Sequence, residues 1–151
     1  KARGASVIAV ASGAKQQSVL DAGANQALIR GNSLQDALGD NAVDAVIDLV
    51  GGEDWPELLN ILRPFGRYAV SGAIAGPIVE LDLRTLYLKD QRFAGCTVLN
   101  EGVFTRLVGL IERRDIKPLL ARSFPLESLS EAQAFFLDKQ FTGKLVIDMG
   151  L

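Results

Sequence analysis

A serine, a lysine and an arginine follow two apolar segments and could together bind a phosphate group. Ser12 and Lys15 come after the apolar run Ser6–Ala11, and Arg30 directly follows the next run, Gln26–Ile29. A serine hydroxyl can donate to a phosphate, and a lysine ammonium neutralises it as a point charge. No acid stands between Ser12 and Lys15, where a site that binds a ribose 2′-hydroxyl usually has Asp or Glu. On residue type alone, the alternative that Ser12 is a helix N-cap and that Lys15 and Arg30 are solvated cations is favoured over a phosphate site.

Glycines follow two later apolar runs. Gly51 and Gly52 come after Asp44–Val50, and Gly72 comes after Gly66–Ser71. Their spacing does not match G-x-G-x-x-G, the turn that presents a helix N-terminus to a pyrophosphate. Glycine at a strand end either lets a ligand approach the backbone or serves an ordinary tight turn.

The residue counts exclude several kinds of site. The 151-residue chain has no histidine and one cysteine, Cys96, so these residues can form neither a histidine-based triad nor a Cys/His zinc site nor a disulfide. The formal net charge of -2 without a basic cluster argues against a nucleic-acid partner. No apolar stretch reaches membrane-spanning length and nothing at the start reads as a signal peptide. These features predict a soluble cytoplasmic protein with no metal and no membrane partner.

Apolar runs of strand length alternate with segments of helical spacing. Gly23 is expected to end the first helix, and Pro56 to lie in the first turn of a later helix that Pro64 closes. Asn100 is expected to cap a helix that runs through Arg114. The remaining expected helices are Ser33–Leu38, Leu83–Leu88 and one that begins with the capping-box pattern Ser128-Leu129-Ser130-Glu131, and the remaining strands are Arg92–Thr97, Ala121–Phe124 and Leu145–Met149.

This alternation predicts an α/β fold, a Rossmann-like doubly wound parallel sheet covered by helices on both faces. Near-continuous apolar strands such as the one that contains Val46 and Ile47 fit that burial. Asp48 is expected to be a hydrogen-bonded structural carboxylate, because a lone buried acid would be costly. Cys96 is expected to pack as a small hydrophobe on the outer strand. Tyr68 and Tyr87 are expected to be core or surface residues and not catalytic proton donors.

Five ordered motifs make the chain resemble a known superfamily. They are Val7–Ser12 with Lys15 and Ala22-Gly23-Ala24, Val43–Gly52, Leu62–Gly72, Leu88–Cys96 and Phe141–Ile147. Each motif is weak alone, but together they span nearly the whole chain in the family's order. The chain thereby resembles the C-terminal half of the medium-chain dehydrogenase/reductase superfamily, in particular its zinc-independent, quinone-oxidoreductase-like members and their alcohol-dehydrogenase-like relatives.

The resemblance implies NADPH as the cofactor and a role for ten residues. Ser12 and Lys15, with Arg30, would select NADPH through its 2′-phosphate. Val50 and Gly51 would face the cofactor from one strand end. The remaining implied cofactor contacts are Ser71, Gly72 and Ala73 on the nicotinamide side, and Gly143 and Lys144 closing over the nicotinamide. No residue is an evident catalytic proton donor.

The resemblance also implies that parts of the family's pattern are missing. The N-terminal catalytic domain, the Gly-rich turn and the first, central strand have no counterpart, so the sheet is expected to be incomplete and the chain to be an inactive fragment. Residues 1–116 would form a partial dinucleotide-binding domain, and 117–151 a C-terminal α+β segment that packs on the missing domain. Hydride transfer to a quinone, enone or related carbonyl compound is the implied activity of the parent enzyme.

Two functions from different classes remain open. One is this NADPH-dependent oxidoreductase, and the other is a non-catalytic nucleotide-binding or dimerisation module. Family members often dimerise by pairing the outer strand, here Arg92–Leu99, across a two-fold axis. A homodimer through this strand is therefore expected.

Overall fold

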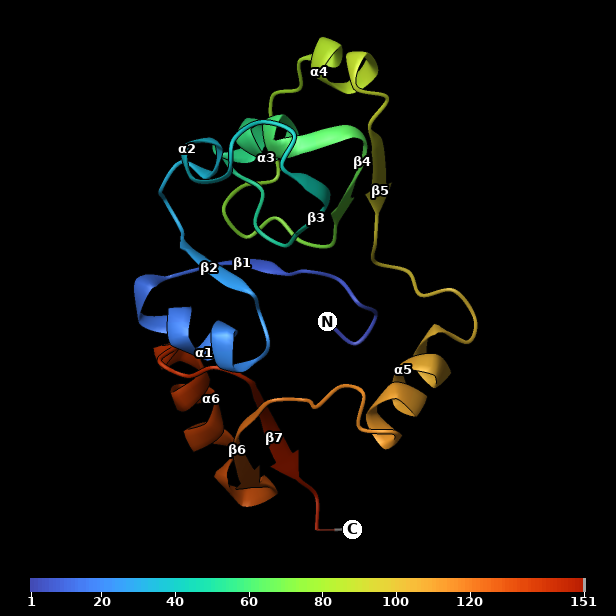
Figure 1. Cartoon of the computed structure of the whole chain (residues 1–151). Helices are drawn as coiled ribbons and strands as arrows, with labels where there is room; N and C mark the ends of the chain where they lie inside the picture. The colour runs from blue at the N-terminus through green and yellow to red at the C-terminus, as the bar shows by residue number, and fades with distance from the viewer. Residues whose placement is uncertain (151) are drawn as a thin grey trace. The chain divides into compact units, whose positions relative to one another are not determined.

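The computed structural model describes residues 1–150, which divide into two compact units (Figure 1). One unit holds Lys1–Ala9, Ala14–Ala27 and 101–150, and the other holds Val10–Gly13 and Leu28–Asn100. The helices are α1 (Gln16–Asp21), α2 (Leu34–Leu38), α3 (Trp55–Ile61), α4 (Leu83–Leu88), α5 (Val103–Glu112) and α6 (Leu129–Asp138). The strands are β1 (Ile8–Ala11), β2 (Gln26–Ile29), β3 (Val43–Asp48), β4 (Leu62–Val70), β5 (Arg92–Gly95), β6 (Leu120–Pro125) and β7 (Lys144–Asp148), and short 3₁₀ turns cover Gly13–Lys15 and Leu126–Ser128.

The strands form three separate sheets. Strands β3, β4 and β5 are parallel neighbours in that order, β6 pairs with β7 in parallel, and β1 pairs with β2. The expected α/β fold with parallel strands is confirmed. Within residues 1–150 no ladder joins β1 to β3. No helix in this range is long and apolar enough to cross a membrane.

Several local signals act as their residue types predict. The Ser33 hydroxyl accepts a hydrogen bond from the Asp36 N–H at 3.1 Å and caps α2. Ala22 is the C-cap residue of α1, and Gly23 follows it with a φ of 106°. Gly23 thus has the left-handed conformation that ends helices. The predicted bounds of β2 and α4 are those observed.

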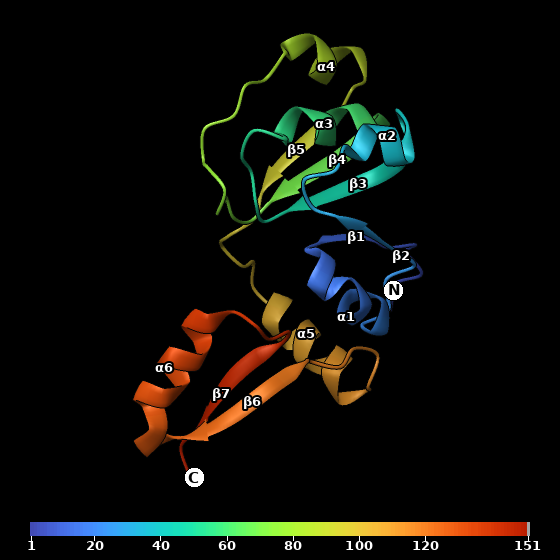
Figure 2. The same cartoon turned by 90° about the vertical axis from the view of Figure 1, so that its left-hand side faces the viewer.

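The core of the three-stranded sheet lies between that sheet and α3. Trp55, Leu59, Leu62 and Tyr68 form one buried cluster. Figure 2 shows α2 and α3 over one face of the sheet. On the other face of this sheet, Ile47 in β3 is 81% exposed.

The prediction that Pro64 closes α3 is wrong. The helix ends at Ile61 and the chain enters β4 at Leu62. The ammonium of Lys89 donates to the carbonyls of Leu59, Asn60 and Leu62 at 2.9–3.2 Å. A lysine distant in the sequence thus supplies hydrogen bonds to carbonyls at the end of the helix, which lack partners within it.

Pro64 itself lies inside β4, at an irregularity of the ladder. The register with β3 shifts between Val43↔Leu62 and Ala45↔Arg67, and Phe65 has a φ of 62°. Proline lacks the N–H that a regular ladder needs, and a bulge is where a strand tolerates it.

Two expected N-caps are also wrong. Helix α5 begins after Gly102, which has a φ of 75°, and not after Asn100. Ser128 precedes α6 but caps no N–H with its side chain, because the 3₁₀ turn Leu126–Ser128 leads directly into the helix.

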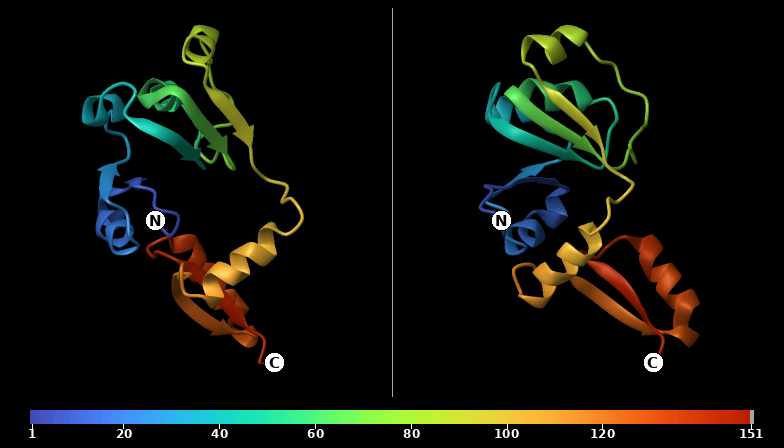
Figure 3. Two further views of the ribbon diagram at one scale, coloured as in Figure 1. Left: turned by 45° about the vertical axis from the view of Figure 1, so that its right-hand side comes forward. Right: turned by 90° about the vertical axis from the view of Figure 1, so that its right-hand side faces the viewer.

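Helix α6 is linked to β6 by an ion pair. Glu131 pairs with Arg122 at 3.0 Å, and the Arg122 guanidinium lies 4.4 Å from the ring centre of Phe124. The two further views show α6 beside β6 and β7 (Figure 3).

Candidate functional site

Five of the predicted cofactor residues lie together where β3 and β4 end. The Ser71 N–H donates to the Asp48 carbonyl at 2.9 Å, and the Ala75 N–H donates to the Val50 carbonyl at 2.9 Å. These bonds hold Val50, Gly51, Ser71, Gly72 and Ala73 in two adjacent loops. The carboxyl ends of parallel strands are where open α/β sheets bind their ligands.

The glycines in these loops are needed for the loops' own packing. A Cβ added to Gly51, whose φ is 61°, would lie 2.6 Å from the Gly76 carbonyl oxygen, and one added to Gly72 would lie 3.0 Å from that of Leu49. Gly51 also forms a parallel bridge with Gly76. Tight turn geometry therefore explains both glycines, and a role in binding a cofactor stays a prediction.

A buried carboxylate fixes the start of the first loop. Asp48 is 5% exposed and accepts hydrogen bonds from the N–H groups of Val50 at 2.8 Å and Gly51 at 3.1 Å. Its other oxygen accepts the Tyr68 hydroxyl at 2.7 Å, and that hydroxyl accepts the indole N–H of Trp55 at 2.8 Å. Asp48 is thus the structural carboxylate that was expected. No spacing motif in the sequence indicates the link from Asp48 through Tyr68 to Trp55.

This network makes the stability of the fold depend on pH through Tyr68. Burial, and then the hydrogen bond to Asp48, raises the pKa of Tyr68 from 10.0 to about 12. The folded state therefore keeps the tyrosine proton more tightly than the unfolded state does. The resulting stabilisation is complete below pH 10 and is lost as the pH rises to about 12. A shift of this size corresponds to roughly 3 kcal/mol of unfolding free energy.

We therefore expect Tyr68→Phe to abolish most of the loss of stability between those two pH values. Urea unfolding of both proteins across this range measures it. Tyr87→Phe is the matched control, because Tyr87 is 62% exposed and should leave the pH dependence unchanged. If Tyr68→Phe loses stability with pH as steeply as the unchanged protein, Tyr68 is not the group responsible.

The pairing of β1 with β2 brings Arg30 next to Ala11, the residue before Ser12. The Arg30 N–H donates to the carbonyl of Ala11, the residue before Ser12, at 2.8 Å. Both residues are exposed. A serine hydroxyl and a guanidinium at neighbouring strand ends suit a phosphate group.

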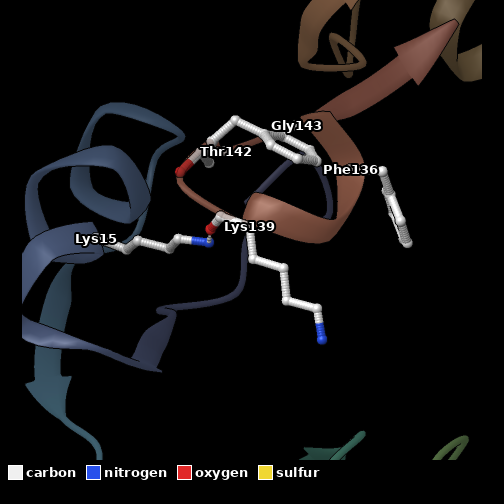
Figure 4. Close-up of a pocket in the computed structure, with 6 residues that line it drawn as sticks. Lys15, Phe136, Lys139, Thr142 and Gly143 are labelled. Carbon is white, nitrogen blue, oxygen red and sulfur yellow. Dashed lines mark hydrogen bonds between the residues drawn. The ribbon is translucent and has the colours of Figure 1, made fainter. Parts of the chain in front are cut away.

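Lys15 and Gly143 line a cavity of about 350 Å³ in the other unit, together with Phe136, Lys139, Thr142 and Phe141. The Lys15 ammonium donates to the Lys139 carbonyl at 3.2 Å, at the C-terminal end of α6 (Figure 4). Figure 4 shows the Lys139 ammonium pointing away from that contact. Sequence reasoning did not single out Lys139. The cavity has two lysines and no acid in its lining.

Of the two residues predicted to close over the nicotinamide, Lys144 is the first residue of β7 and Gly143 directly precedes it. A Cβ on Gly143, whose φ is 110°, would lie 2.8 Å from the Leu119 carbonyl oxygen, and the Lys144 N–H donates to that same carbonyl at 2.8 Å. Gly143 therefore allows β6 and β7 to approach closely. The side chain of Lys144 is exposed.

Cys96 differs from its expected role. It follows β5, its N–H donates to the Val70 carbonyl at 2.8 Å, and its side chain is exposed and free. It does not pack as a small hydrophobe, because the described residues place no layer over this position.

Comparison with known proteins decides the family. The model of the zinc-binding dehydrogenase family matches residues 1–113. The chain belongs to this family. It is 30% identical over 161 residues to quinone oxidoreductase-like protein 2 of Bos taurus, a match that covers 96% of this chain and 46% of the relative. The chain spans between 31% and 46% of the length of the curated relatives that it matches.

Solved structures agree with the fold of this family. A Sinorhizobium meliloti 1021 protein provisionally described as an alcohol dehydrogenase is 46% identical, with a TM-score of 0.86 over 97% of this chain and 43% of that one. A crotonyl-CoA carboxylase/reductase variant in complex with NADP has a TM-score of 0.84 over 97% of this chain and 44% of that one. At 19% identity the second likeness shows the fold alone.

The family's description implies zinc, and the described residues do not fit that metal. Residues 1–150 contain no group of three His, Cys, Asp or Glu side chains that could hold a metal ion. A zinc shell needs four donors, usually imidazoles and thiolates, and this chain has no histidine and a single cysteine.

Proposed function

We propose that this chain is the dinucleotide-binding part of an NADPH-dependent oxidoreductase. The observation that carries the proposal is the hydrogen bond from the Arg30 N–H to the Ala11 carbonyl, which brings Arg30 next to the residue before Ser12, with no acid between Ser12 and Lys15. An acid there would repel a 2′-phosphate and favour NADH, whereas these side chains donate to it and neutralise it. The NADP complex of a protein with this fold supports the same class of cofactor.

We assign a part of the cofactor to each of the ten residues that the resemblance singled out. Ser12, Lys15 and Arg30 would bind the 2′-phosphate. The loops of Val50–Gly51 and Ser71–Ala73 would follow the dinucleotide at the sheet edge, and Gly143 and Lys144 would close over the nicotinamide. Bound NADPH supplies a hydride, while the protein orients the nicotinamide and excludes water.

The acceptor in the whole protein would be a quinone, an enone or a related carbonyl compound. The relative named quinone oxidoreductase-like protein 2 supports this class. In each of these acceptors a conjugated carbonyl makes a carbon electrophilic, so a hydride from NADPH can add there and a proton from solvent completes the reduction.

Lys15→Ala should weaken NADPH binding by about tenfold, the effect of losing one charge-assisted contact, and should change NADH binding by much less. Isothermal titration of this chain with each dinucleotide measures the two affinities. Lys117→Ala is the control, because Lys117 is an exposed lysine outside the candidate site. Urea unfolding of Lys15→Ala checks the loss of its contact with Lys139. Equal weakening of both dinucleotides, or negligible binding of both, would remove the cofactor assignment.

A specific observation also favours a homodimer through the outer strand. Strand β5 is an edge of its sheet, all of its residues are exposed, and Val98 and Leu99 beyond it are 92% and 65% exposed. An open edge strand can pair with a second copy across a two-fold axis. This surface would serve equally in the alternative function, a non-catalytic nucleotide-binding or dimerisation module.

Sedimentation velocity should therefore show a dimer that Val98→Asp converts to a monomer, because a buried carboxylate at the pairing edge would lack a partner. Ile78→Asp is the control, since Ile78 is 87% exposed but lies outside Arg92–Leu99. A monomer at all concentrations, or a dimer that Val98→Asp leaves intact, would contradict pairing through this strand. A dimer that binds neither dinucleotide would favour the dimerisation module over the oxidoreductase.

A further inference from the structure

A crevice of about 320 Å³ opens beside the three-stranded sheet, and its wall is aromatic. Trp55 from α3, Tyr68 from β4 and Phe93 from β5 line it, with ring centres 5.2–6.0 Å apart. Trp55 meets the other two rings edge-on, at 85° and 89°. None of the lining residues carries a charge.

The polar atoms of this wall are already paired inside the protein. The Trp55 N–H donates to the Tyr68 hydroxyl, and that hydroxyl donates to Asp48. A ligand in the crevice therefore leaves no donor of these rings unpaired, and its binding would depend on apolar contact.

One glycine in the crevice differs from those at the cofactor loops. Gly95 comes two residues after Phe93 in β5, so both belong to the same face of the sheet. A Cβ added to Gly95 would meet nothing within 4 Å, and Gly95 has no left-handed φ. At Gly51 and Gly72 the chain's own backbone occupies the space that a side chain would need, whereas at Gly95 that space is open.

We propose that this crevice binds a flat, uncharged aromatic ring. Aromatic side chains favour edge-to-face and offset contacts with a further ring, beyond the gain from burying its surface. The cavity is near the lower end of the range of about 300–1,000 Å³ for ligand sites, which suits a compound with one or two rings. The ring can belong to a free aromatic compound or to the nicotinamide of a dinucleotide, because Gly51 and Ala73 line this crevice too. The inference does not rest on the cofactor assignment.

The single tryptophan of the chain reports on the crevice directly. Trp55 is 5% exposed, so a quencher in solution reaches it poorly. Nitrobenzene is a flat, uncharged ring and an efficient quencher of indole emission. We expect nitrobenzene to quench Trp55 along a saturating curve, because it binds against the indole. Linear quenching without saturation would overturn the proposal.

Two variants and a control locate the effect. Gly95→Leu places a side chain in the open space and should abolish saturable quenching. Phe93→Leu keeps an apolar side chain but removes one ring, and should weaken the binding several-fold. Gly13→Leu is the matched control, because Gly13 also has open space and no left-handed φ but lies outside the crevice, and it should bind as the unchanged protein does. Far-ultraviolet circular dichroism confirms that each variant is folded. Saturable quenching that survives in both Gly95→Leu and Phe93→Leu would overturn the proposal.

Competition separates the two sources of the ring. Displacement of nitrobenzene by NADPH but not by adenosine 2′,5′-bisphosphate, which lacks the nicotinamide, would assign the crevice to the nicotinamide ring. Retention of nitrobenzene while NADPH binds would assign it to a separate aromatic compound. If NADPH does not bind at all, the cofactor proposal fails while the nitrobenzene result still stands, so the two proposals fail separately.

Discussion

Asp48→Ala should lower the free energy of unfolding by about 3–5 kcal/mol, because it leaves several buried donors without an acceptor. The N–H groups of Val50 and Gly51 and the hydroxyl of Tyr68 all donate to this carboxylate. The Tyr68 hydroxyl is buried, so water cannot fully replace the carboxylate there. Urea unfolding of the variant, followed by circular dichroism, measures the loss.

Asp44→Ala is the matched control from the same strand. Asp44 pairs with Arg63 at 2.6 Å, but both side chains are more than 60% exposed. An exposed ion pair contributes only about 0–1 kcal/mol, so this variant should remain nearly as stable as the unchanged protein. Equal losses for Asp48→Ala and Asp44→Ala would show that the buried network does not hold the two strand ends.

A double substitution tests whether the Asp48 effect passes through Tyr68. Once Tyr68 is phenylalanine, no hydroxyl remains to be orphaned, so Asp48→Ala should cost less in Tyr68→Phe than in the unchanged protein. The remaining cost belongs to the N–H groups of Val50 and Gly51. Additive losses would mean that the carboxylate stabilises only its own loop.

Leu59→Ala should lower the free energy of unfolding by about 2–5 kcal/mol, the usual range for emptying a filled core position. Leu59 is 2% exposed and packs in the cluster with Trp55, Leu62 and Tyr68. Alanine keeps the helical propensity of α3, so the loss reports packing and not helix formation. Thermal and urea unfolding measure it.

Leu88→Ala in α4 is the control for Leu59→Ala. Leu88 is 71% exposed, and its truncation should change stability by less than about 0.5 kcal/mol. A small loss at Leu59, comparable with that at Leu88, would mean that α3 is not packed firmly on the sheet.

Local signals explain why much of the fold could be predicted. The Ser33 cap, the left-handed Gly23 and the alternation of apolar runs with helical segments each depend on residues within a few positions of one another. Signals of this range also failed where a competing local structure intervened. Ser128 resembles an N-cap, but the 3₁₀ turn before α6 removes the extended backbone that such a cap needs.

The candidate site was predictable only in part. The glycines at the strand ends were found from their spacing, but spacing could not tell that Gly51 faces the backbone of Gly76 while Gly95 faces open space. Lys139 was missed because it becomes a neighbour of Lys15 only through folding, 124 positions along the chain.

By itself the sequence determined the class of fold and the order of its elements, since these follow from periodicity and from residue types. Only the tertiary structure decided where α3 ends, because its carbonyls are paired by Lys89 from a later loop. The tertiary structure alone decided that the side chain of Ile47 is exposed and that Asp48, Tyr68 and Trp55 form one hydrogen-bonded chain. The physical reason is range: caps and turns are set by neighbouring residues, whereas burial and the pairing of buried polar groups are set by residues that only folding brings together.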